Sequence, residues 1–355
     1  MNIREHVELA PYTTLRIGGA ARYLAECVTD EDVSEALRFA DEHSVAAQVL
    51  GGGSNVIVND RGFPGTILRI GLRGIHFEGE GDDVVITAAA GEDWDALVAE
   101  TVRRGLSGIE CLSGIPGLVG GTPIQNVGAY GQEIAETLET VTCLVRRTLE
   151  RVTFAAGECA FAYRSSRFKY ADRDRFVVLQ VTLRVRTNAR PQLKYPELIR
   201  SVEAASPLDA LTPVQAVAAV RDVVLQLRRS KSMVVDPTDP NSCSAGSFFL
   251  NPVVSTQTFD HLQQRWRERH GEGASIPSFP APDGVKVPAA WLVEQAGFSK
   301  GLRRNGVGIS ASHALALINT GDGTAHQLLA LADEIQGAVR QTFGLILERE
   351  PVVIG

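Results

Sequence analysis

The segment from Ile115 to Gly131 constrains this chain more than any other. It reads Ile-Pro-Gly-Leu-Val-Gly-Gly-Thr-Pro-Ile-Gln-Asn-Val-Gly-Ala-Tyr-Gly, with five glycines among seventeen residues and no charge. Glycine costs about 1 kcal/mol relative to alanine inside a helix, and it gives a strand no side chain to pack. Its bare backbone instead lets a phosphate or a flat ring approach closely. The segment therefore indicates either a tight buried turn or a ligand-binding loop.

A second glycine cluster favours the binding loop. Between Val49 and Val58, one apolar run precedes Gly-Gly-Gly-Ser-Asn and another follows it, which predicts a strand, a loop and a strand. No Gly-Lys-Ser/Thr follows, so this is not a Walker motif, and Val56 stands where the dinucleotide motif has its third glycine. The chain thus has two loops of the phosphate-cradling type without either common nucleotide fingerprint.

The two loops together carry a family resemblance. Their combination resembles the UDP-N-acetylenolpyruvoylglucosamine reductase family, the flavoenzymes of bacterial cell-wall precursor synthesis. The resemblance continues in order through Phe161-Ala-Tyr-Arg-Ser-Ser-Arg-Phe168, Ser244-Ala-Gly-Ser-Phe-Phe-Leu-Asn-Pro252 and Leu347-Glu-Arg-Glu350. One such motif is a weak signal, but five in sequence over nearly the whole chain are specific.

The resemblance implies an α+β fold with two parts. These are a two-subdomain FAD-binding fold of the PCMH (vanillyl-alcohol-oxidase-like) type and a smaller α+β substrate-binding domain. We expect subdomain 1 at 1–72, subdomain 2 at 73–232 with the C-terminal strand 345–355 returning to it, and the substrate domain at 233–344. A length of 355 residues suits two or three domains. The linker-like run Asp-Pro-Thr-Asp-Pro-Asn after Val235 supports the last boundary.

Hydrophobic periodicity and capping signals predict the individual elements. The clearest signals are the alternation of apolar residues from Val177 to Val185, the capping box from Thr212 to Gln215, and a long helix that ends at Gly344 with the inward-facing residues Leu328, Leu331, Ile335 and Val339. The expected helices are 30–43, 92–104, 213–229, 257–269, 288–296 and 324–343. The expected strands are 45–50, 65–70, 84–90, 141–145, 151–154, 176–186, one within 307–319, and 345–354. Segment 14–22 either forms a simple strand and turn or, as in the family, precedes the first strand near the flavin.

Composition excludes several classes of function. The net charge is −7 and the pI about 5.6, which disfavours nucleic-acid binding. No apolar run approaches the length of a membrane span, and the N-terminus has no hydrophobic signal core. The five cysteines are scattered without a C-x-x-C pair, which favours free thiols in a reducing cytoplasm and no metal site. We expect a cytoplasmic monomer with a small-molecule substrate.

The resemblance implies non-covalent FAD, with NADPH as the reductant. Neither glycine loop has an obvious histidine or cysteine for covalent flavin attachment. NADPH would reduce the flavin and leave before the enolpyruvyl substrate binds in the same place. The expected cofactor-binding residues are Gly51, Gly52, Gly53, Ser54, Asn55, Ile115, Pro116, Gly117, Gly120, Gly121, Thr122, Gln125, Asn126 and Gly128.

The implied reaction needs three kinds of chemistry. Hydride must add to a vinyl carbon, and because side chains cannot carry hydride a cofactor must supply it. Negative charge then spreads toward the substrate carboxylate, where a fixed donor contributes roughly 3–4 kcal/mol in comparable sites. The family correspondence gives this role to Arg164, proton donation to Ser247, and orientation of Arg164 or stabilisation of an enol to Glu350.

Each of these residues also has a structural interpretation. Ser247 after Gly is commonly a turn or cap residue, and Arg164 could belong to a solvated basic turn with Arg167 and Lys169, which we expect at the surface. Glu350 could be solvated like Glu348, which lies on the same side of a regular strand, so spacing does not separate the two.

The substrate contacts are also implied by the resemblance. The expected substrate-binding residues are Tyr130, Tyr195, Arg228, Lys231 and Asn251. Tyr195 could instead plug a loop base, and the two cations could simply end a helix. Leu250 departs from the family motif, where a basic or polar residue is expected, and this puts one phosphate or nicotinamide contact in doubt.

Two other functions remain open at this stage. One is a flavin oxidase of the same FAD-binding fold, acting on an alcohol or amine with oxygen. The other is a nucleotide-sugar binding protein that has lost catalysis, although the presence of Ser247, Arg164 and Glu350 argues against it.

Overall fold

The computed structural model describes residues 1–79, 81–205 and 207–355, and the chain divides into two compact units. Unit 1 comprises Met1–Glu8, Ala20–Gly53 and Phe63–Val234. Unit 2 comprises Leu9–Gly19, Ser54–Gly62 and Val235–Gly355. The chain thus passes into unit 2 near the boundary expected at residue 233, while the division of the first part at residue 72 stays a prediction.

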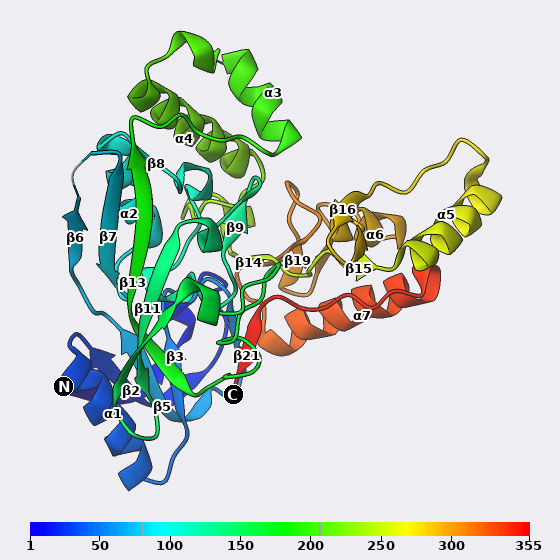
Figure 1. Cartoon of the computed structure of the whole chain (residues 1–355). Coiled ribbons are helices and arrows are strands. Elements are labelled where there is room, and N and C mark those ends of the chain that lie inside the picture. Colours follow the sequence, from blue (N-terminus) through cyan, green and yellow to red (C-terminus); the bar gives the residue numbers. More distant parts are fainter. Residues whose placement is uncertain (80, 206) are drawn as a thin grey trace. The chain divides into compact units, whose positions relative to one another are not determined.

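Unit 1 contains two larger sheets, a short hairpin and four α-helices among its described residues (Figure 1). Its strands are β1 (Asn2–Glu8), β2 (Ala20–Cys27), β3 (Ala47–Leu50), β5 (Phe63–Ile70), β6 (Ile75–Glu78), β7 (Asp83–Ala89), β8 (Leu106–Ser107), β9 (Gly128–Ala129), β10 (Gln132–Glu133), β11 (Leu138–Val145), β12 (Arg151–Ala155) and β13 (Phe176–Thr187). Its helices are α1 (Asp30–Glu42), α2 (Trp94–Arg103), α3 (Pro196–Ala205) and α4 (Pro213–Ser230), with 3₁₀ turns at Glu110–Leu112, Val119–Gly121, Ile134–Glu136, Ala156–Glu158 and Leu208–Ala210.

The first sheet of unit 1 has the strand order β1-β2-β5-β3. Strands β2 and β3 both run parallel to β5, while β1 is antiparallel to β2. Strands that run parallel in one sheet need a crossover connection, and α1 connects β2 to β3, which lie on either side of β5. This helix begins with a capping box in which Thr29 and Asp32 bond each other's backbone N–H groups.

The second sheet of unit 1 has the order β12-β11-β13-β7-β6, with β8 also paired to β13. All of its pairings are antiparallel. The predicted alternation along β13 is confirmed, because Val177, Leu179, Val181, Leu183 and Val185 are all buried. Residues of both sheets and of α2, such as Leu68, Ile86 and Leu97, belong to one continuous hydrophobic core.

Helices α3 and α4 pack on each other and form a separate small core (Figure 1). Leu198 and Val202 of α3 meet Val220 and Val224 of α4, together with Cys111. The predicted capping box at the start of α4 is confirmed, with Thr212 and Gln215 as its members. The α3 helix is absent from the predicted elements, although Pro196 at its first position is well suited to the first turn of a helix.

Unit 2 contains three small sheets and three α-helices among its described residues. Its strands are β4 (Val56–Val58), β14 (Ser244–Ser247), β15 (Val253–Val254), β16 (Phe279–Ala281), β17 (Gly284–Lys286), β18 (Arg303–Arg304), β19 (Val307–Ile309), β20 (Ala316–Asn319) and β21 (Val352–Ile354). Its helices are α5 (Thr256–His270), α6 (Ala289–Gln295) and α7 (Ala325–Phe343), with 3₁₀ turns at Ala10–Tyr12 and Pro240–Ser242. The sheet orders are β14-β20-β19-β18, β15-β17-β16 and β21-β4.

The long helix α7 supplies much of the unit 2 core. Its predicted inward face is confirmed, because Leu328, Leu331, Ile335 and Val339 are buried. The helix ends at Gly344, whose φ of +74° gives the left-handed cap that glycine favours.

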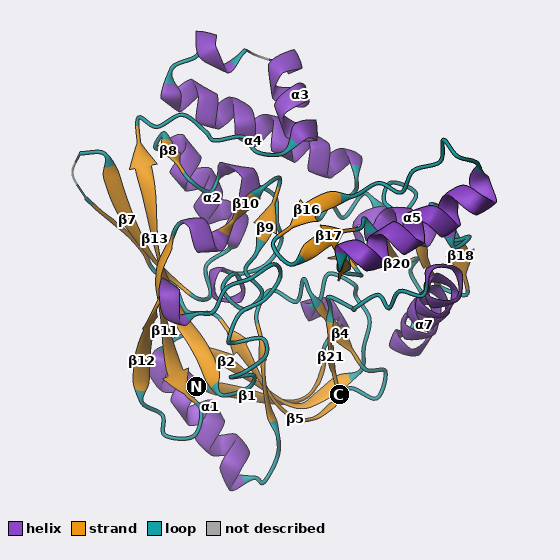
Figure 2. Ribbon diagram, turned by 45° about the vertical axis from the view of Figure 1, so that its right-hand side comes forward, coloured by secondary structure: helices purple, strands orange, loops and turns teal. Residues whose placement is uncertain are grey.

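The predicted C-terminal strand is wrong in extent and in partner. Only Val352–Ile354 forms a strand, and it pairs in parallel with β4 rather than with the segment 73–232 (Figure 2). Pro351 has no N–H to donate, and Phe249 bridges Arg349 just before it. The residues 345–351 therefore do not continue the strand of β21.

Other chain-wide expectations concern thiols, metals and membranes. All five cysteines are free. Among the described residues, no group of three or more His, Cys, Asp and Glu side chains is arranged to hold a metal ion. Within the same residues, no helix has both the length and the apolar character that crossing a membrane requires.

Candidate functional site

The two glycine loops touch each other through their backbones in unit 1. A Cβ placed on Gly52 would lie 2.8 Å from the Cα of Gly117, closer than real Cβ atoms come. Next to it, a Cβ on Gly51 would lie 3.9 Å from Leu118 Cδ1. The close approach of the two loops therefore requires glycine at residue 52. This requirement could not be predicted from the sequence, because the two loops are far apart along the chain.

The two loops differ in what they offer a ligand. In the second loop the N–H groups of Val119, Gly120 and Gly121 already donate to protein carbonyls. A Cβ on Gly121, in contrast, would meet nothing within 4 Å. In the first loop, the N–H of Gly52 has no acceptor among the described residues. The second loop therefore offers a ligand open surface more than free N–H groups.

Flavin would fit these two loops on chemical grounds. A pyrophosphate needs free backbone donors and close access to bare main chain. The exposed Gly52 provides the first, and Gly51 and Gly121, both exposed, provide the second. When bound, FAD supplies the hydride-carrying chemistry that protein side chains lack.

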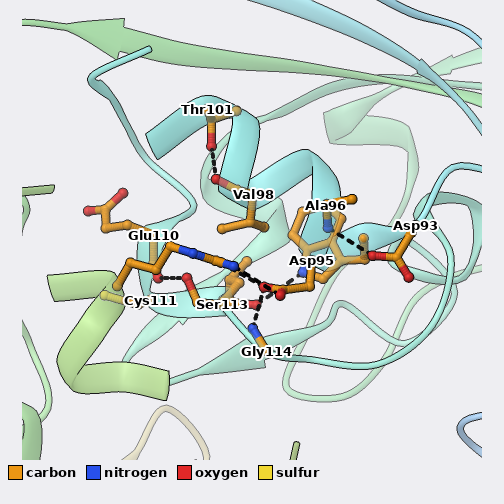
Figure 3. Close-up of polar contacts among 12 residues, drawn as sticks. Asp93, Asp95, Ala96, Val98, Thr101, Glu110, Cys111, Ser113 and Gly114 are labelled. Carbon is orange, nitrogen blue, oxygen red and sulfur yellow. Dashed lines mark hydrogen bonds and ion pairs between the residues drawn. The ribbon is translucent and has the colours of Figure 1, made fainter. Parts of the chain in front are cut away.

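The start of α2 holds the second glycine loop in place. Trp94 N–H donates to Gly117 O at 3.1 Å, and the Trp94 indole donates to Leu112 O at 3.1 Å. Asp95 accepts the N–H of Gly114 at 2.6 Å (Figure 3). The same carboxylate accepts two bonds from Arg221 of α4, at 2.7 and 3.0 Å. Asp95 thus connects the entry of the loop to two helices.

Burial alone would raise the pKa of Asp95. The hydrogen bonds from Arg221 and Gly114 outweigh it and lower the pKa of Asp95 below its ordinary value. The carboxylate is therefore held in its charged form within this network.

Arg164 lies in a tight turn beside the β9–β10 hairpin. Ala162 and Ser165 exchange backbone bonds of 3.1 and 3.0 Å, and Arg164 between them has φ +52°. Its Nη2 donates to Gly128 O at 2.6 Å. Positive φ is unusual for arginine, and such strained residues gather at functional sites.

Two other expected site residues share this unusual backbone. Asn126 has φ +46° and Tyr130 has φ +50°. The Asn126 amide donates to Glu133 Oε2 at 2.6 Å and to Ala162 O at 3.1 Å, so it connects the glycine segment to the Arg164 turn. Thus Asn126, Gly128, Tyr130 and Arg164 are brought together in unit 1.

The expectation that Arg167 and Lys169 are surface charges is wrong. Lys169 Nζ donates to Arg164 O at 3.0 Å, and Arg167 pairs with the buried Asp172 at 2.6 Å. Both side chains are half-buried, and they fix the turn that presents Arg164. Sequence could not show this, because it depends on how the chain folds back on itself.

Three of the expected substrate-binding residues form one cluster. Tyr195 is exposed, and its ring meets that of Tyr130 edge-on, with the centroids 5.6 Å apart. Lys231 Nζ lies 5.9 Å from the Tyr130 ring centroid and pairs with Glu197 of α3 at 2.7 Å. Burial raises the pKa of Tyr130 to about 12, so its hydroxyl stays protonated.

Arg228 differs from these residues because its side chain is only 7% exposed. Its Nη2 donates to Met233 O at 2.8 Å, while its Nε has no partner among the described residues. Burial lowers the pKa of Arg228 to about 10, and the nearby Tyr130 and Asp95 oppose this shift. Arg228 thus places a buried positive charge near Tyr130.

Ser247 and Glu350 lie on neighbouring segments of unit 2. The N–H of Glu350 donates to Phe248 O at 2.9 Å, and the N–H of Leu250 donates to Glu348 O at 2.9 Å. Glu350 is half-buried whereas Glu348 is exposed, and this separates two carboxylates that sequence spacing could not. Arg164 belongs to unit 1, so its place relative to this pair stays a prediction.

His313 also contacts Ser247, and sequence reasoning missed it. Its Nε2 lies 3.3 Å from Ser247 Oγ. The only sequence signal was a histidine among small residues in Ser-Ala-Ser-His-Ala. That signal is weak without the strand pairing that brings residue 313 to residue 247.

The remaining expected site residues serve local structure as well. Asn55 Nδ2 donates to Glu350 O at 3.3 Å, and Asn251 Oδ1 accepts the N–H of Ala289 at the start of α6. Thr122 is buried and bonds Val119 O. Leu250 is buried, which explains why an apolar residue stands there. Ser54, Ile115, Pro116 and Gln125 are partly buried.

Comparisons with known proteins agree with this arrangement. Residues 21–151 match the FAD binding domain family, and residues 237–354 match the family described as UDP-N-acetylenolpyruvoylglucosamine reductase, C-terminal domain. The reductase of that name from Thermobifida fusca is 47% identical over 99% of this chain and 97% of its own length. The Streptomyces avermitilis reductase is 46% identical over 98% of this chain and 93% of its own length.

A solved structure agrees as well. The crystal structure of UDP-N-acetylenolpyruvylglucosamine reductase from Thermus caldophilus is 26% identical, has a TM-score of 0.66 and covers 100% of both chains.

Fold, glycine loops and comparisons together define a flavin-dependent oxidoreductase with an FAD-binding domain and an α+β C-terminal domain. Within that class, the chain belongs to the UDP-N-acetylenolpyruvoylglucosamine reductase family.

Proposed function

We propose that this chain reduces the enolpyruvyl group of UDP-N-acetylglucosamine enolpyruvate to the lactyl ether, giving UDP-N-acetylmuramate for peptidoglycan synthesis. NADPH is the reductant and FAD the resident cofactor. The observation that carries the proposal is the backbone bond from Glu350 N–H to Phe248 O at 2.9 Å, which places the segment of Glu350 beside the segment that carries Ser247. A serine hydroxyl and a half-buried carboxylate on neighbouring segments suit the addition of a proton next to an anionic carbon.

Ser247, Arg164 and Glu350 have different roles in the reaction. Ser247 delivers the proton to the carbon that bears the carboxylate. Arg164, fixed by its bond to Gly128 O, stabilises the negative charge that spreads into that carboxylate. Glu350 orients Arg164 or stabilises the protonated enol form.

The nucleotide sugar needs its own cations because the chain as a whole is acidic. Lys231 contacts the diphosphate, and the buried charge of Arg228 adds to the local positive potential. Tyr195, stacked edge-on against Tyr130, covers this part of the substrate. We further propose that the protein works as a monomer in the cytoplasm.

Ser247→Ala tests the chemistry directly. The variant should still lose its oxidised-flavin absorption when NADPH is added, but the enolpyruvyl substrate should restore that absorption at least a hundredfold more slowly. An unchanged rate of restoration would remove Ser247 from the mechanism.

The two carboxylates near the C-terminus provide a matched pair of variants. Glu350→Gln should lower kcat strongly, whereas Glu348→Gln, at an exposed position two residues away, should leave kcat within about twofold. Equal effects of the two substitutions would contradict the role given to Glu350.

A further inference from the structure

Ser247 meets a histidine that none of the roles above includes. His313 Nε2 lies 3.3 Å from Ser247 Oγ, and both side chains are half-buried. Hydrogen bonds of catalytic groups are often long without substrate and shorten when it binds. Ser247 ends β14, whereas His313 lies in the turn between β19 and β20.

The backbone fixes this juxtaposition from both sides. Ser247 is paired with Ala316 of β20, and Phe248 N–H donates to Leu315 O at 2.8 Å. Ala316 N–H donates to His313 O at 3.1 Å, which closes the turn that carries the histidine. Ala316 of β20 therefore connects to both Ser247 and His313. The backbone of this sheet keeps the His313 imidazole close to the Ser247 hydroxyl.

We propose that His313 orients the Ser247 hydroxyl and returns a proton to it after each turnover. This inference rests on the proposed function. The Oγ–H bond of Ser247 breaks as a C–H bond forms on the substrate carbon. The resulting alkoxide takes the proton from Nε2 of protonated His313, and the imidazole regains a proton from water.

The low acidity of a serine hydroxyl favours a neighbouring proton donor beside Ser247. A serine hydroxyl is a weak acid, so its loss of a proton leaves a costly alkoxide unless a neighbour supplies a proton. Imidazole is the side chain whose charge changes most readily near neutral pH, so it can accept and return protons there. His313 stands at hydrogen-bond distance from the atom that needs this support.

If the role of His313 were only structural, its substitution would act by weakening the turn between β19 and β20. Ser310 provides the matched control, because its Oγ accepts Ser312 N–H at 3.1 Å in the same turn. Ser310→Ala weakens the turn without removing the contact between imidazole and hydroxyl. His313→Gln keeps a hydrogen-bonding end group but removes the ability to supply a proton.

The experiment follows the two half-reactions of the FAD-loaded enzyme separately in a rapid-mixing instrument. NADPH bleaches the flavin absorption in the first, and the enolpyruvyl nucleotide sugar restores it in the second. His313→Gln should slow the restoration by about a hundredfold and leave the bleaching rate unchanged. Ser310→Ala should change neither rate by more than about twofold.

Rescue provides a second readout that does not depend on one variant. Added imidazole should speed the restoration in His313→Ala but not in Ser247→Ala. A wild-type restoration rate in His313→Gln, equal slowing of both half-reactions, or slowing by Ser310→Ala as large as by His313→Gln would overturn the inference. Failure of the proposed function itself would look different, because the wild type would then show no restoration at all.

Discussion

Gly52 and Gly117 approach so closely that a Cβ on Gly52 would lie 2.8 Å from the Cα of Gly117. The two residues are far apart in sequence, yet they bring the two glycine loops into one contact within unit 1. Packing within the protein therefore requires glycine at residue 52. At Gly121 it does not, because a Cβ there would meet nothing within 4 Å.

This difference predicts opposite behaviour for two alanine substitutions. Gly52→Ala should destabilise even the FAD-free protein, by about 1–3 kcal/mol, because backbone atoms must move to make room. Gly121→Ala should leave the stability of the FAD-free protein within about 0.5 kcal/mol, but should weaken FAD binding about tenfold or more, because its methyl group would occupy space that we assign to the cofactor. Thermal unfolding without FAD and fluorescence titration with FAD measure the two effects. A Gly121→Ala protein with normal FAD affinity would show that this surface does not face the cofactor.

The Asp95 network predicts a pH-dependent contribution to stability. Asp95→Asn should lower stability at pH 7 by about 1–2 kcal/mol and weaken FAD binding, because the side chain that joins Arg221 to Gly114, at the entry of the second loop, loses its charge. The folded protein lowers the pKa of Asp95, so this contribution is present above the unfolded value of about 3.9 and is lost as the pH falls through the folded value. Unfolding curves of wild type and variant should therefore converge in acid.

Glu100→Gln is the matched control for that experiment. Glu100 lies on the same helix and pairs with Arg103 and Arg104, but these pairs are at the surface. Its loss should leave FAD affinity unchanged. An equal loss of affinity in both variants would mean that α2 acts only through its general stability.

The Lys231–Glu197 pair predicts an unusual gain in affinity. Glu197 forms an ion pair with Lys231, the cation that we assign to the substrate diphosphate. Glu197→Gln should therefore tighten binding of the nucleotide sugar about two- to fivefold, the size of a partly exposed ion pair, with kcat unchanged. Glu136→Gln, which removes the Lys194–Glu136 pair beside Tyr195, should leave the Kd unchanged. Weaker substrate binding in Glu197→Gln would show that Glu197 supports Lys231 instead of competing for it.

The buried thiols predict slow alkylation of the native protein. Burial raises the pKa of Cys27 and of Cys143 to about 12 in each case, so little thiolate forms at pH 8. Cys243 is only partly buried and should react first. Mass spectrometry after a short exposure to iodoacetamide gives the order of labelling, and early labelling of Cys27 would contradict the described core.

Much of the fold could be predicted from sequence because its signals are local. The alternation along β13 and the inward face of α7 follow from side-chain periodicity alone. The capping box at Thr212 and the left-handed Gly344 are local backbone signals too. The helix α3 was missed because its short apolar face shows only when it packs on α4.

The candidate site is likewise only partly predictable from the sequence. Arg164, Ser247 and Glu350 are predicted from motifs and their roles stay predictions, whereas the closeness of the segments that carry Ser247 and Glu350 is seen only in the backbone bonds of the folded unit. His313, Glu197 and Asp95 carried no motif, because each acts through a partner remote in sequence. The C-terminal strand was misplaced for a related reason: its pairing with β4 is parallel and nonlocal.

The most direct test of the account is an anaerobic absorption titration of the purified wild-type protein. The account predicts oxidised-flavin bands that bleach on addition of NADPH and return when UDP-N-acetylglucosamine enolpyruvate is added, with one equivalent of UDP-N-acetylmuramate formed for each flavin. Bands that bleach and do not return would contradict the substrate assignment. A protein that shows no flavin bands even after addition of FAD would contradict the assignment of the two glycine loops.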